Sequence, residues 1–221
     1  MPVFLDTRDA GFNADFETLL GSKRESSKDV SETVAAIIAD VRVRGDAAVL
    51  ELTAKFDRLE LTRETLRFSV EEIEAAWRDV DPDVRAALEL AHTRITAHHE
   101  KQKPQDSRYT DAIGVTLGTR WTPVESVGLY VPGGLASYPS SVLMNAIPAR
   151  VAGVERLAMV VPTPDGVVNP AILAAARIAG VDEIYRVGGA QAVAALAFGT
   201  ATIAPVAKVV GPGNAFVAAA K

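Results

Sequence analysis

The chain has 221 residues, of which 48% are hydrophobic and 23% are charged, and its formal net charge is −5 at pH 7. This acidic balance argues against nucleic acid or an anionic membrane as the main partner, because clustered Lys and Arg side chains bind both. The sequence contains no cysteine, which excludes disulfides, thiolate nucleophiles and cysteine-ligated metal sites. No apolar run approaches the roughly 20 residues of a membrane span, and the N-terminus lacks a secretory signal pattern. We therefore expect a soluble, cytoplasmic protein.

Charged side chains are concentrated in the first half of the chain. Residues 1–105 contain 36 Asp, Glu, Lys and Arg residues, whereas residues 127–221 contain only 10. The first half therefore has solvated faces, while the second is apolar enough to form a largely buried sheet with closely packed helices. We expect a helical N-terminal region with a short strand segment over residues 1–126, followed by a second domain over residues 127–221.

The first half has the apolar spacing of amphipathic helices. A stripe of apolar residues between positions 30 and 41 predicts a helix, which Gly45 would end. Asp46 stands where it can cap the next helix. That helix would turn three large side chains inward, namely Val49, Leu52 and Phe56.

Two further helix starts follow. Residues 69–72 fit a capping box, and Asp81 followed by Pro82 is typical of a capped helix with proline at its first position. The second of these helices should fade before Pro104. Trp77 and Trp121 lie on apolar faces, which favours a place in the core over a role as a cofactor platform.

The pattern changes near residue 115. Residues 115–121 alternate with a period of two, which indicates a half-buried strand. Strand, glycine-rich turn and helix then repeat, with strands expected at 127–131, 157–161, 184–187 and 209–210, and helices at 139–152, 170–179, 192–198 and from 215 onward. This alternation predicts a parallel sheet with right-handed crossovers, a doubly wound α/β layout.

Details of the later helices add three expectations. Pro148 should kink the helix over residues 139–152 or end it early, and Ser140 and Ser141 would cap that helix. Residues 214–221 begin like a helix but contain no stop signal. We therefore expect the chain to be a piece of a longer protein, and a frayed but genuine C-terminus is the alternative.

Three glycine-rich turns are candidates for ligand binding. Residues 130–134 read YVPGG, residues 187–191 read VGGAQ, and residues 210–214 read VGPGN. Each follows a predicted strand, and ligands of open α/β sheets bind in the crevice beyond the carboxyl ends of the strands. Glycines there let backbone N–H groups approach a phosphate, and the following helix adds positive potential. Together the turns predict a site for a dinucleotide or another phosphorylated ligand.

Other familiar sites are absent. No turn matches G-x-G-x-x-G or the G-x-x-x-x-G-K-[ST] phosphate loop, and no G-x-S-x-G follows a strand. The histidines His92, His98 and His99 lack the i, i+4 spacing of a helical metal pair. His98 continues an apolar helix face and should be partly buried, with His99 pointing elsewhere. The sequence therefore predicts neither catalytic nor metal-ligating residues in this chain.

The sequences of these turns closely resemble those of the histidinol dehydrogenase family. The resemblance is carried by residues 128–149 (GLYVPGGLASYPSSVLMNAIPA), 187–192 (VGGAQA) and 209–214 (VVGPGN), and in the first half by 42–46 (RVRGD) and 99–102 (HEKQ). It spans essentially the whole chain. One departure is Leu135, where many members have a basic residue.

This resemblance implies an N-terminal portion of an NAD- and zinc-dependent enzyme that oxidises L-histidinol to L-histidine, the last step of histidine biosynthesis. The family's NAD contacts map onto Tyr130, Gln191 and Asn214, and residues 127–221 would form a truncated, Rossmann-like NAD-binding domain. The family's zinc ligands, its Glu-His pair and most of its substrate contacts would lie outside this sequence. The family enzyme is a homodimer, whose first domain is completed by chain that follows the nucleotide domain.

Two alternatives stay open. The chain could be a paralogous nucleotide-binding or assembly module of the same fold without catalysis, perhaps pairing with a separate catalytic chain. It could also belong to a related dehydrogenase that acts on another small alcohol, because substrate residues are absent. Recovery of zinc-dependent NAD reduction on mixing with a separate chain would favour the module.

Overall fold

The computed structural model describes residues 3–133 and 138–221, and for residues 22–28 it describes the backbone alone. The helices are α1 (Phe12–Arg44), α2 (Asp46–Asp57), α3 (Arg63–Leu66), α4 (Val70–Asp79), α5 (Pro82–Glu100), α6 (Pro139–Ala152), α7 (Pro170–Ile178), α8 (Gly189–Phe198) and α9 (Ala215–Ala220), with a 3-10 turn η1 (Pro164–Gly166). The strands are β1 (Ser107–Thr110), β2 (Thr116–Thr119), β3 (Ser126–Tyr130), β4 (Arg156–Val160), β5 (Glu183–Tyr185) and β6 (Lys208–Val210). Within the described residues, no helix is long and apolar enough to cross a membrane.

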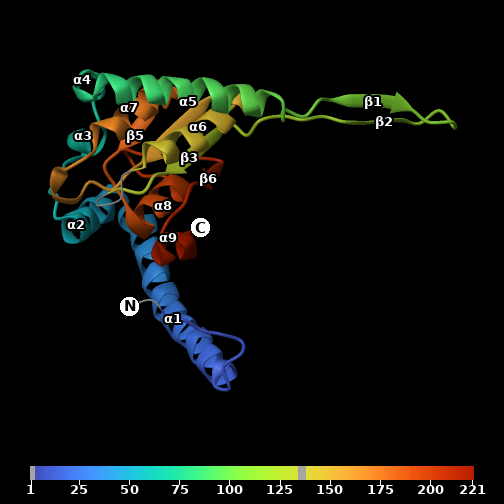
Figure 1. The fold of residues 1–221 in the computed structure, drawn as a ribbon. Coiled ribbons are helices and arrows are strands. Elements are labelled where there is room, and N and C mark those ends of the chain that lie inside the picture. Colours follow the sequence, from blue (N-terminus) through green and yellow to red (C-terminus); the bar gives the residue numbers. More distant parts are fainter. Residues whose placement is uncertain (1–2, 134–137) are drawn as a thin grey trace.

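The core of the molecule is a parallel sheet with the strand order β5-β4-β3-β6 (Figure 1). β3 pairs with β4 on one side and with β6 on the other, with Leu129 opposite both Met159 and Val210. The chain therefore moves outward from β3 through β4 to β5 and then returns to the opposite side of β3. Such a reversal leaves a crevice at the carboxyl ends of the strands.

Helices cover both faces of this sheet, as the doubly wound prediction requires. Val127 and Leu129 of β3 pack into a cluster with α4, α5, α6 and α7. Tyr130 belongs to a second cluster with α1, α2, α8 and α9. The alternation follows from the pleat, because successive side chains of a strand point to opposite faces. The predicted boundary after residue 126 stays a prediction.

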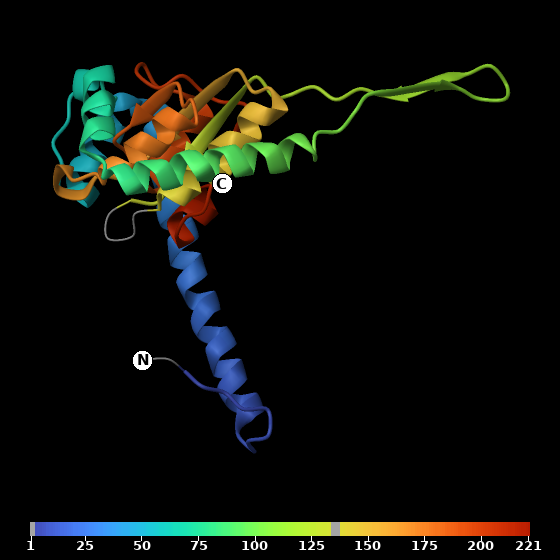
Figure 2. The same cartoon turned by 45° about the horizontal axis from the view of Figure 1, so that its top comes forward.

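The predicted helix signals of the first half are largely confirmed. α1 ends before Gly45, whose positive φ of 57° suits a residue without a Cβ. Ser69 and Glu72 form a capping box at the start of α4, and Asp81 caps α5, which begins at Pro82 and ends before Pro104. α1 starts well before the predicted stripe, and its first half projects away from the sheet in both views (Figures 1 and 2).

Two predictions about α2 are wrong. Asp46 makes no capping hydrogen bond to its own helix. It is only 2% exposed, and its carboxylate accepts hydrogen bonds from the N–H and the hydroxyl of Thr202, at 3.3 and 2.9 Å. The Arg63 guanidinium lies 3.2 Å from the same carboxylate. Phe56 is 47% exposed instead of buried, because it faces the cavity described below.

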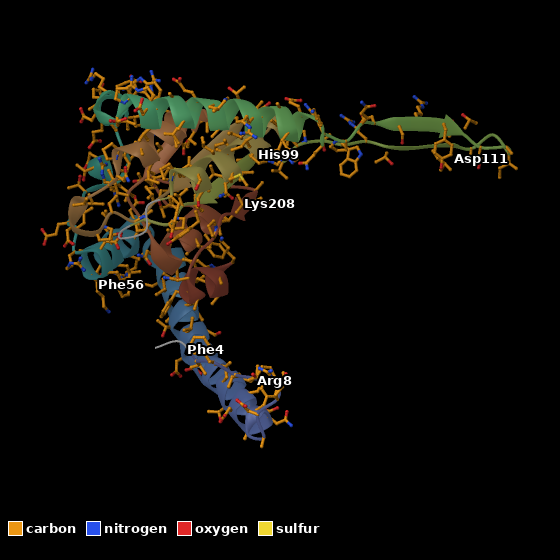
Figure 3. All side chains as sticks on the ribbon, in the orientation of Figure 1. Phe4, Arg8, Phe56, His99, Asp111 and Lys208 are labelled. Atoms are coloured by element: carbon orange, nitrogen blue, oxygen red, sulfur yellow. The ribbon has the colours of Figure 1, made fainter. Side chains whose placement is uncertain are left out.

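The strand predicted near residues 115–121 is present, but the prediction that it is half-buried was wrong. β2 pairs with β1 in an antiparallel hairpin that extends from the body with Asp111 near its tip (Figure 3). Both strands are exposed along their whole length, and Trp121 is exposed as well, contrary to its predicted place in the core. Trp77 is half-buried between the guanidinium groups of Arg85 and Arg177.

The strands and helices of the second half lie close to their predicted positions. α6 spans the predicted residues and continues past Pro148 to Ala152, so it does not end early. Neither Ser140 nor Ser141 caps it, because the N-cap is Tyr138 and makes no side-chain cap hydrogen bond. α8 begins at Gly189, three residues before its predicted start.

The contact between Asp46 and Thr202 ties α2 to the chain that follows α8, and it generates a stability prediction. We expect Asp46→Asn to lower the free energy of unfolding by about 1–3 kcal/mol, because the partly buried donors of Thr202 would lose their charged acceptor and the exposed Arg63 guanidinium would lose its ion pair. Glu51→Gln removes an exposed carboxylate from the same helix and should cost less than about 0.5 kcal/mol. Urea unfolding of both variants measures the difference. Equal stability of the two variants would contradict the role assigned to Asp46.

Candidate functional site

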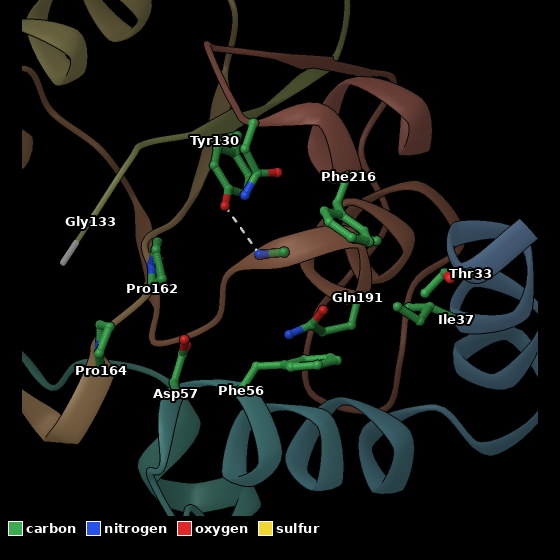
Figure 4. Close-up of a pocket in the computed structure, with 13 residues that line it drawn as sticks. Thr33, Ile37, Phe56, Asp57, Tyr130, Gly133, Pro162, Pro164, Gln191 and Phe216 are labelled. Atoms are coloured by element: carbon green, nitrogen blue, oxygen red, sulfur yellow. Dashed lines mark hydrogen bonds between the residues drawn. The ribbon is translucent and has the colours of Figure 1, made fainter. Parts of the chain in front are cut away.

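A cavity of about 480 Å³ lies at the carboxyl end of the sheet. It opens where β3 and β4 end, and the starts of α8 and α9 and parts of α1 and α2 close its sides (Figure 4). It is lined by Thr33, Ile37, Phe56, Asp57, Tyr130, Gly133, Pro162, Pro164, Gly189, Ala190, Gln191, Asn214 and Phe216. This is the crevice that the reversal of strand order predicts.

The structure brings Tyr130, Gln191 and Asn214 together in the lining of this cavity. They come from three separate turns, at the ends of β3, β5 and β6. The expectation that they contact NAD stays a prediction. Gly134 and Leu135, which belong to the first turn and to the departure from the family pattern, lie outside the described residues.

Tyr130 joins the end of β3 to the start of α8. Its ring is almost fully buried, and its hydroxyl oxygen accepts a hydrogen bond of 3.1 Å from the backbone N–H of Gly189 (Figure 4). Burial raises the pKa of the Tyr130 phenol above its ordinary value, so the hydroxyl keeps its proton at neutral pH. That proton has no acceptor within the described residues. Tyr130 is therefore anchored through its oxygen and retains a donor.

Gln191 lies in the first turn of α8 with its carboxamide in the cavity (Figure 4). The residue is only 2% exposed, yet its side chain makes no hydrogen bond with another described residue. The amide atoms are not fully buried, because they face the open space of the cavity. The chain folds tightly around this side chain, because a Cβ on Gly189 would lie 2.6 Å from the Gln191 Oε1 atom. The carboxamide is therefore a fixed polar group that has both donors and acceptor available.

The oxygen and the nitrogen of the Asn214 side chain have different roles. It is the N-cap of α9, where its Oδ1 atom accepts a hydrogen bond of 3.1 Å from the backbone N–H of Val217. The sequence reasoning had placed it at the start of a helix without identifying this cap. Because the oxygen is engaged, the exposed Nδ2 amide is the part that can serve a ligand, as a donor.

The glycines of these turns have a packing role that the sequence analysis did not predict, and their predicted role at a phosphate stays a prediction. A Cβ on Gly188 would lie 2.4 Å from the Cβ of Pro162, and one on Gly211 would lie 2.1 Å from the carbonyl oxygen of Tyr130. Both contacts are far below van der Waals distance. The glycines therefore allow the turns to pack against one another, which brings the polar side chains into one cavity.

Sequence reasoning missed Asp57, the last residue of α2. It lines the cavity, is only 8% exposed, and its Oδ2 atom has no hydrogen-bond partner. Burial raises the pKa of the Asp57 carboxyl, against smaller lowering effects of Arg58 and of the Thr163 backbone. A signal was present, because Asp57 continues the buried stripe of Val49 and Thr53 at steps of four residues. A charged residue on a buried helical stripe is unusual.

The histidines form no comparable site. His98 is exposed, contrary to expectation, and His99 is the partly buried one. Gln102 links them, with its Oε1 atom 2.8 Å from the His99 Nδ1 atom and its Nε2 atom 3.1 Å from the His98 Nε2 atom. Across residues 3–133 and 138–221, no three His, Cys, Asp or Glu residues are grouped so that they could hold a metal ion. The described residues therefore do not fit a zinc centre.

Comparisons with known proteins agree with this architecture. The family model for histidinol dehydrogenase matches residues 20–221. The chain is 70% identical to histidinol dehydrogenase of Cereibacter sphaeroides and 67% identical to that of Ruegeria pomeroyi, over all 221 residues and 51% of each relative. The crystal structure of histidinol dehydrogenase from Elizabethkingia anophelis matches with a TM-score of 0.82 and 38% identity, over 86% of this chain and 44% of that chain.

The extent of these matches defines what they show. The chain spans about half the length of the curated relatives it matches. The family model covers nearly all of it, including the three turns that form the cavity. By its sequence and by its fold, this chain belongs to the histidinol dehydrogenase family.

Proposed function

We propose that this chain supplies the NAD-binding half of an enzyme that oxidises L-histidinol to L-histidine. The observation that carries the proposal is the cavity at the carboxyl end of the sheet, into which the Gln191 carboxamide points without a hydrogen-bond partner among the described residues (Figure 4). Membership of the histidinol dehydrogenase family gives the substrate and the reaction. When bound, NAD supplies the acceptor for the hydride that leaves the alcohol carbon.

The polar groups around the cavity suit a dinucleotide. The Gln191 carboxamide can pair with a ribose hydroxyl or with the amide of the nicotinamide, since it both donates and accepts. The Asn214 amide and the Tyr130 hydroxyl add donors at the ends of β6 and β3. Phe56 and Phe216 line the same cavity and offer apolar surface for a ring. These residues bind and orient the cofactor, and we assign none of them a proton-transfer step.

Zinc belongs to the chemistry of the histidinol dehydrogenase family. The described residues contain no cluster that fits a metal ion. We infer that the zinc ligands, the groups that handle protons and most contacts to L-histidinol are contributed from outside residues 1–221. The chain therefore provides the dinucleotide end of a larger active site.

The shape of the chain supports a larger assembly, which we propose to be a homodimer in the cytoplasm. The β1–β2 hairpin and the first half of α1 both project from the body (Figures 1 and 2). The hairpin exposes large apolar side chains in Tyr109, Ile113 and Leu117. Exposed apolar surface of this kind is typical of segments that a partner covers.

Titration of the 221-residue chain with NAD tests the proposal. We expect saturable binding by calorimetry, but no NADH on addition of L-histidinol and zinc, because the residues for that chemistry lie elsewhere. Lack of NAD binding by the folded chain would contradict the proposal. NADH formation by the isolated chain would contradict the assignment of the chemistry to residues outside it.

The role of Gln191 generates a sharper prediction. Gln191→Ala should weaken NAD binding roughly two- to tenfold, because a directed hydrogen bond inside the cavity would be lost. Gln102→Ala removes an exposed glutamine that contacts only the two histidines and serves as the matched control. Calorimetric dissociation constants of the two variants measure the effect. The same affinity in both would show that Gln191 does not contact the cofactor.

The divided role of Asn214 can be resolved with two substitutions. Asn214→Ala removes both cap and amide, and should weaken NAD binding and destabilise the chain by about 1 kcal/mol. Asn214→Ser keeps a capping oxygen but lacks the amide, so it should keep its stability and still bind NAD weakly. Urea unfolding and NAD titration separate the two effects. Wild-type NAD affinity in Asn214→Ser would restrict Asn214 to the cap.

A further inference from the structure

The carboxyl group of Asp57 is a buried acid that the fold satisfies only in part. It lines the cavity, and its Oδ2 atom is buried without a hydrogen-bond partner. The neighbouring cation forms no ion pair with it, because the Arg58 guanidinium is held by Asp165 through hydrogen bonds of 2.7 and 2.5 Å. A buried carboxyl without an ion pair is uncommon in a protein core. The position therefore indicates a group kept for a ligand.

Two residues near this carboxyl, Arg58 and Asp165, have an unfavourable backbone conformation. Arg58 and Asp165 have φ angles of 53° and 55°, and they are the non-glycine residues with positive φ in the part of the chain that the structure describes. Their two side chains form the ion pair that joins the end of α2 to η1. Strain of this kind concentrates where a fold must position a functional group. Here it places Asp57 against Thr163.

The position of Asp57 relative to the sheet indicates which ligand it binds. In dinucleotide-binding folds, an acidic residue after the second strand accepts hydrogen bonds from a ribose diol. The second strand of this sheet is β4, and the chain that leaves it at residues 161–163 contains no acid. Thr163 occupies this place, buried and with its hydroxyl unpartnered. Asp57 reaches the same place from α2, since it lines the cavity together with Pro162 and Pro164, the neighbours of Thr163 in the chain (Figure 4).

The charge around the cavity distinguishes two kinds of dinucleotide. Asp57 brings an acid, and among the side chains that the structure describes, the lining includes no Lys or Arg that could hold an additional phosphate. Lys221 lies near Tyr130, but it donates a hydrogen bond to the Gly211 carbonyl and is not part of the lining. A phosphate on the ribose would therefore meet an acid without a compensating cation.

We propose that Asp57 accepts hydrogen bonds from a ribose diol of the bound dinucleotide and selects NAD over NADP, whose ribose carries a phosphate. This inference rests on the proposed function, because it presupposes that the cavity binds NAD. It adds a specificity-determining residue from α2, an element outside the three glycine-rich turns.

The test compares NAD and NADP binding to the wild-type chain, to Asp57→Asn and to Asp57→Ser. Asp79→Asn, which changes an exposed carboxylate at the end of α4, is the matched control. We expect the wild type and the control to prefer NAD. Asp57→Asn should bind NAD about tenfold more weakly, because a hydrogen bond to a charged acceptor is lost. Its preference over NADP should fall by a similar factor, and Asp57→Ser should behave alike.

Thermal unfolding distinguishes this role from a structural one. Because the Oδ2 atom of Asp57 has no partner and an asparagine keeps a carbonyl oxygen for the Thr163 backbone, Asp57→Asn should leave the midpoint of unfolding unchanged or raise it. A lowered midpoint together with equal losses of NAD and NADP binding would assign Asp57 to the fold and overturn the inference. Wild-type preference for NAD in both variants would also overturn it, while the proposed function would stand. A wild-type chain that binds neither dinucleotide would overturn both.

Discussion

The hydrogen bond from the Gly189 N–H to the Tyr130 hydroxyl joins the end of β3 to the start of α8. The central strand, the covering helix and the floor of the cavity all meet at this contact. The neighbouring turns approach closely around it, with Gly188 against Pro162 and Gly211 against the Tyr130 carbonyl. Larger residues at these glycines would separate the turns and spread the polar groups apart. The geometry of the cavity therefore depends on the packing of backbone against backbone.

The two ends of α2 carry the same chemical group, a buried carboxylate, in two different roles. Asp46 begins the helix and is buried with its carboxylate bonded to Thr202 and Arg63. Asp57 ends the helix and is buried with one oxygen unpartnered beside the cavity. A satisfied carboxylate at one end fixes α2 on the body, and an unsatisfied one at the other end faces the crevice. This arrangement is consistent with a helix that is secured at one end in order to present a group at the other.

Much of the second half could be predicted because its signals are local. Strands buried on both faces read as apolar runs, and glycine or proline marks their ends, so β3 and β4 were found within one residue. The three turn residues Tyr130, Gln191 and Asn214 could be placed together because parallel strands end at one edge. The packing role of Gly188 could not be found, since it depends on Pro162 in another turn.

The failures arose where tertiary position decides. The alternation in β2 correctly indicates a strand, but its exposure follows from a hairpin that leaves the body. Asp46 has the sequence position of a cap, yet its partner Thr202 lies 156 residues away. Asp57 could not be identified for the same reason, because its position at the cavity depends on the chain between β4 and η1. The local sequence pattern determines whether a residue lies in a helix or a strand. Residues far away in the sequence determine how deeply it is buried and which partners it contacts.

A crystal structure of the chain grown with NAD tests the central claim most directly. We expect the dinucleotide in the cavity at the carboxyl ends of β3, β4 and β6, with the Gln191 carboxamide and the Asn214 amide within hydrogen-bond distance. A cavity that stays empty at saturating NAD, or a dinucleotide bound elsewhere on the chain, would contradict the claim that this half of the protein holds the cofactor.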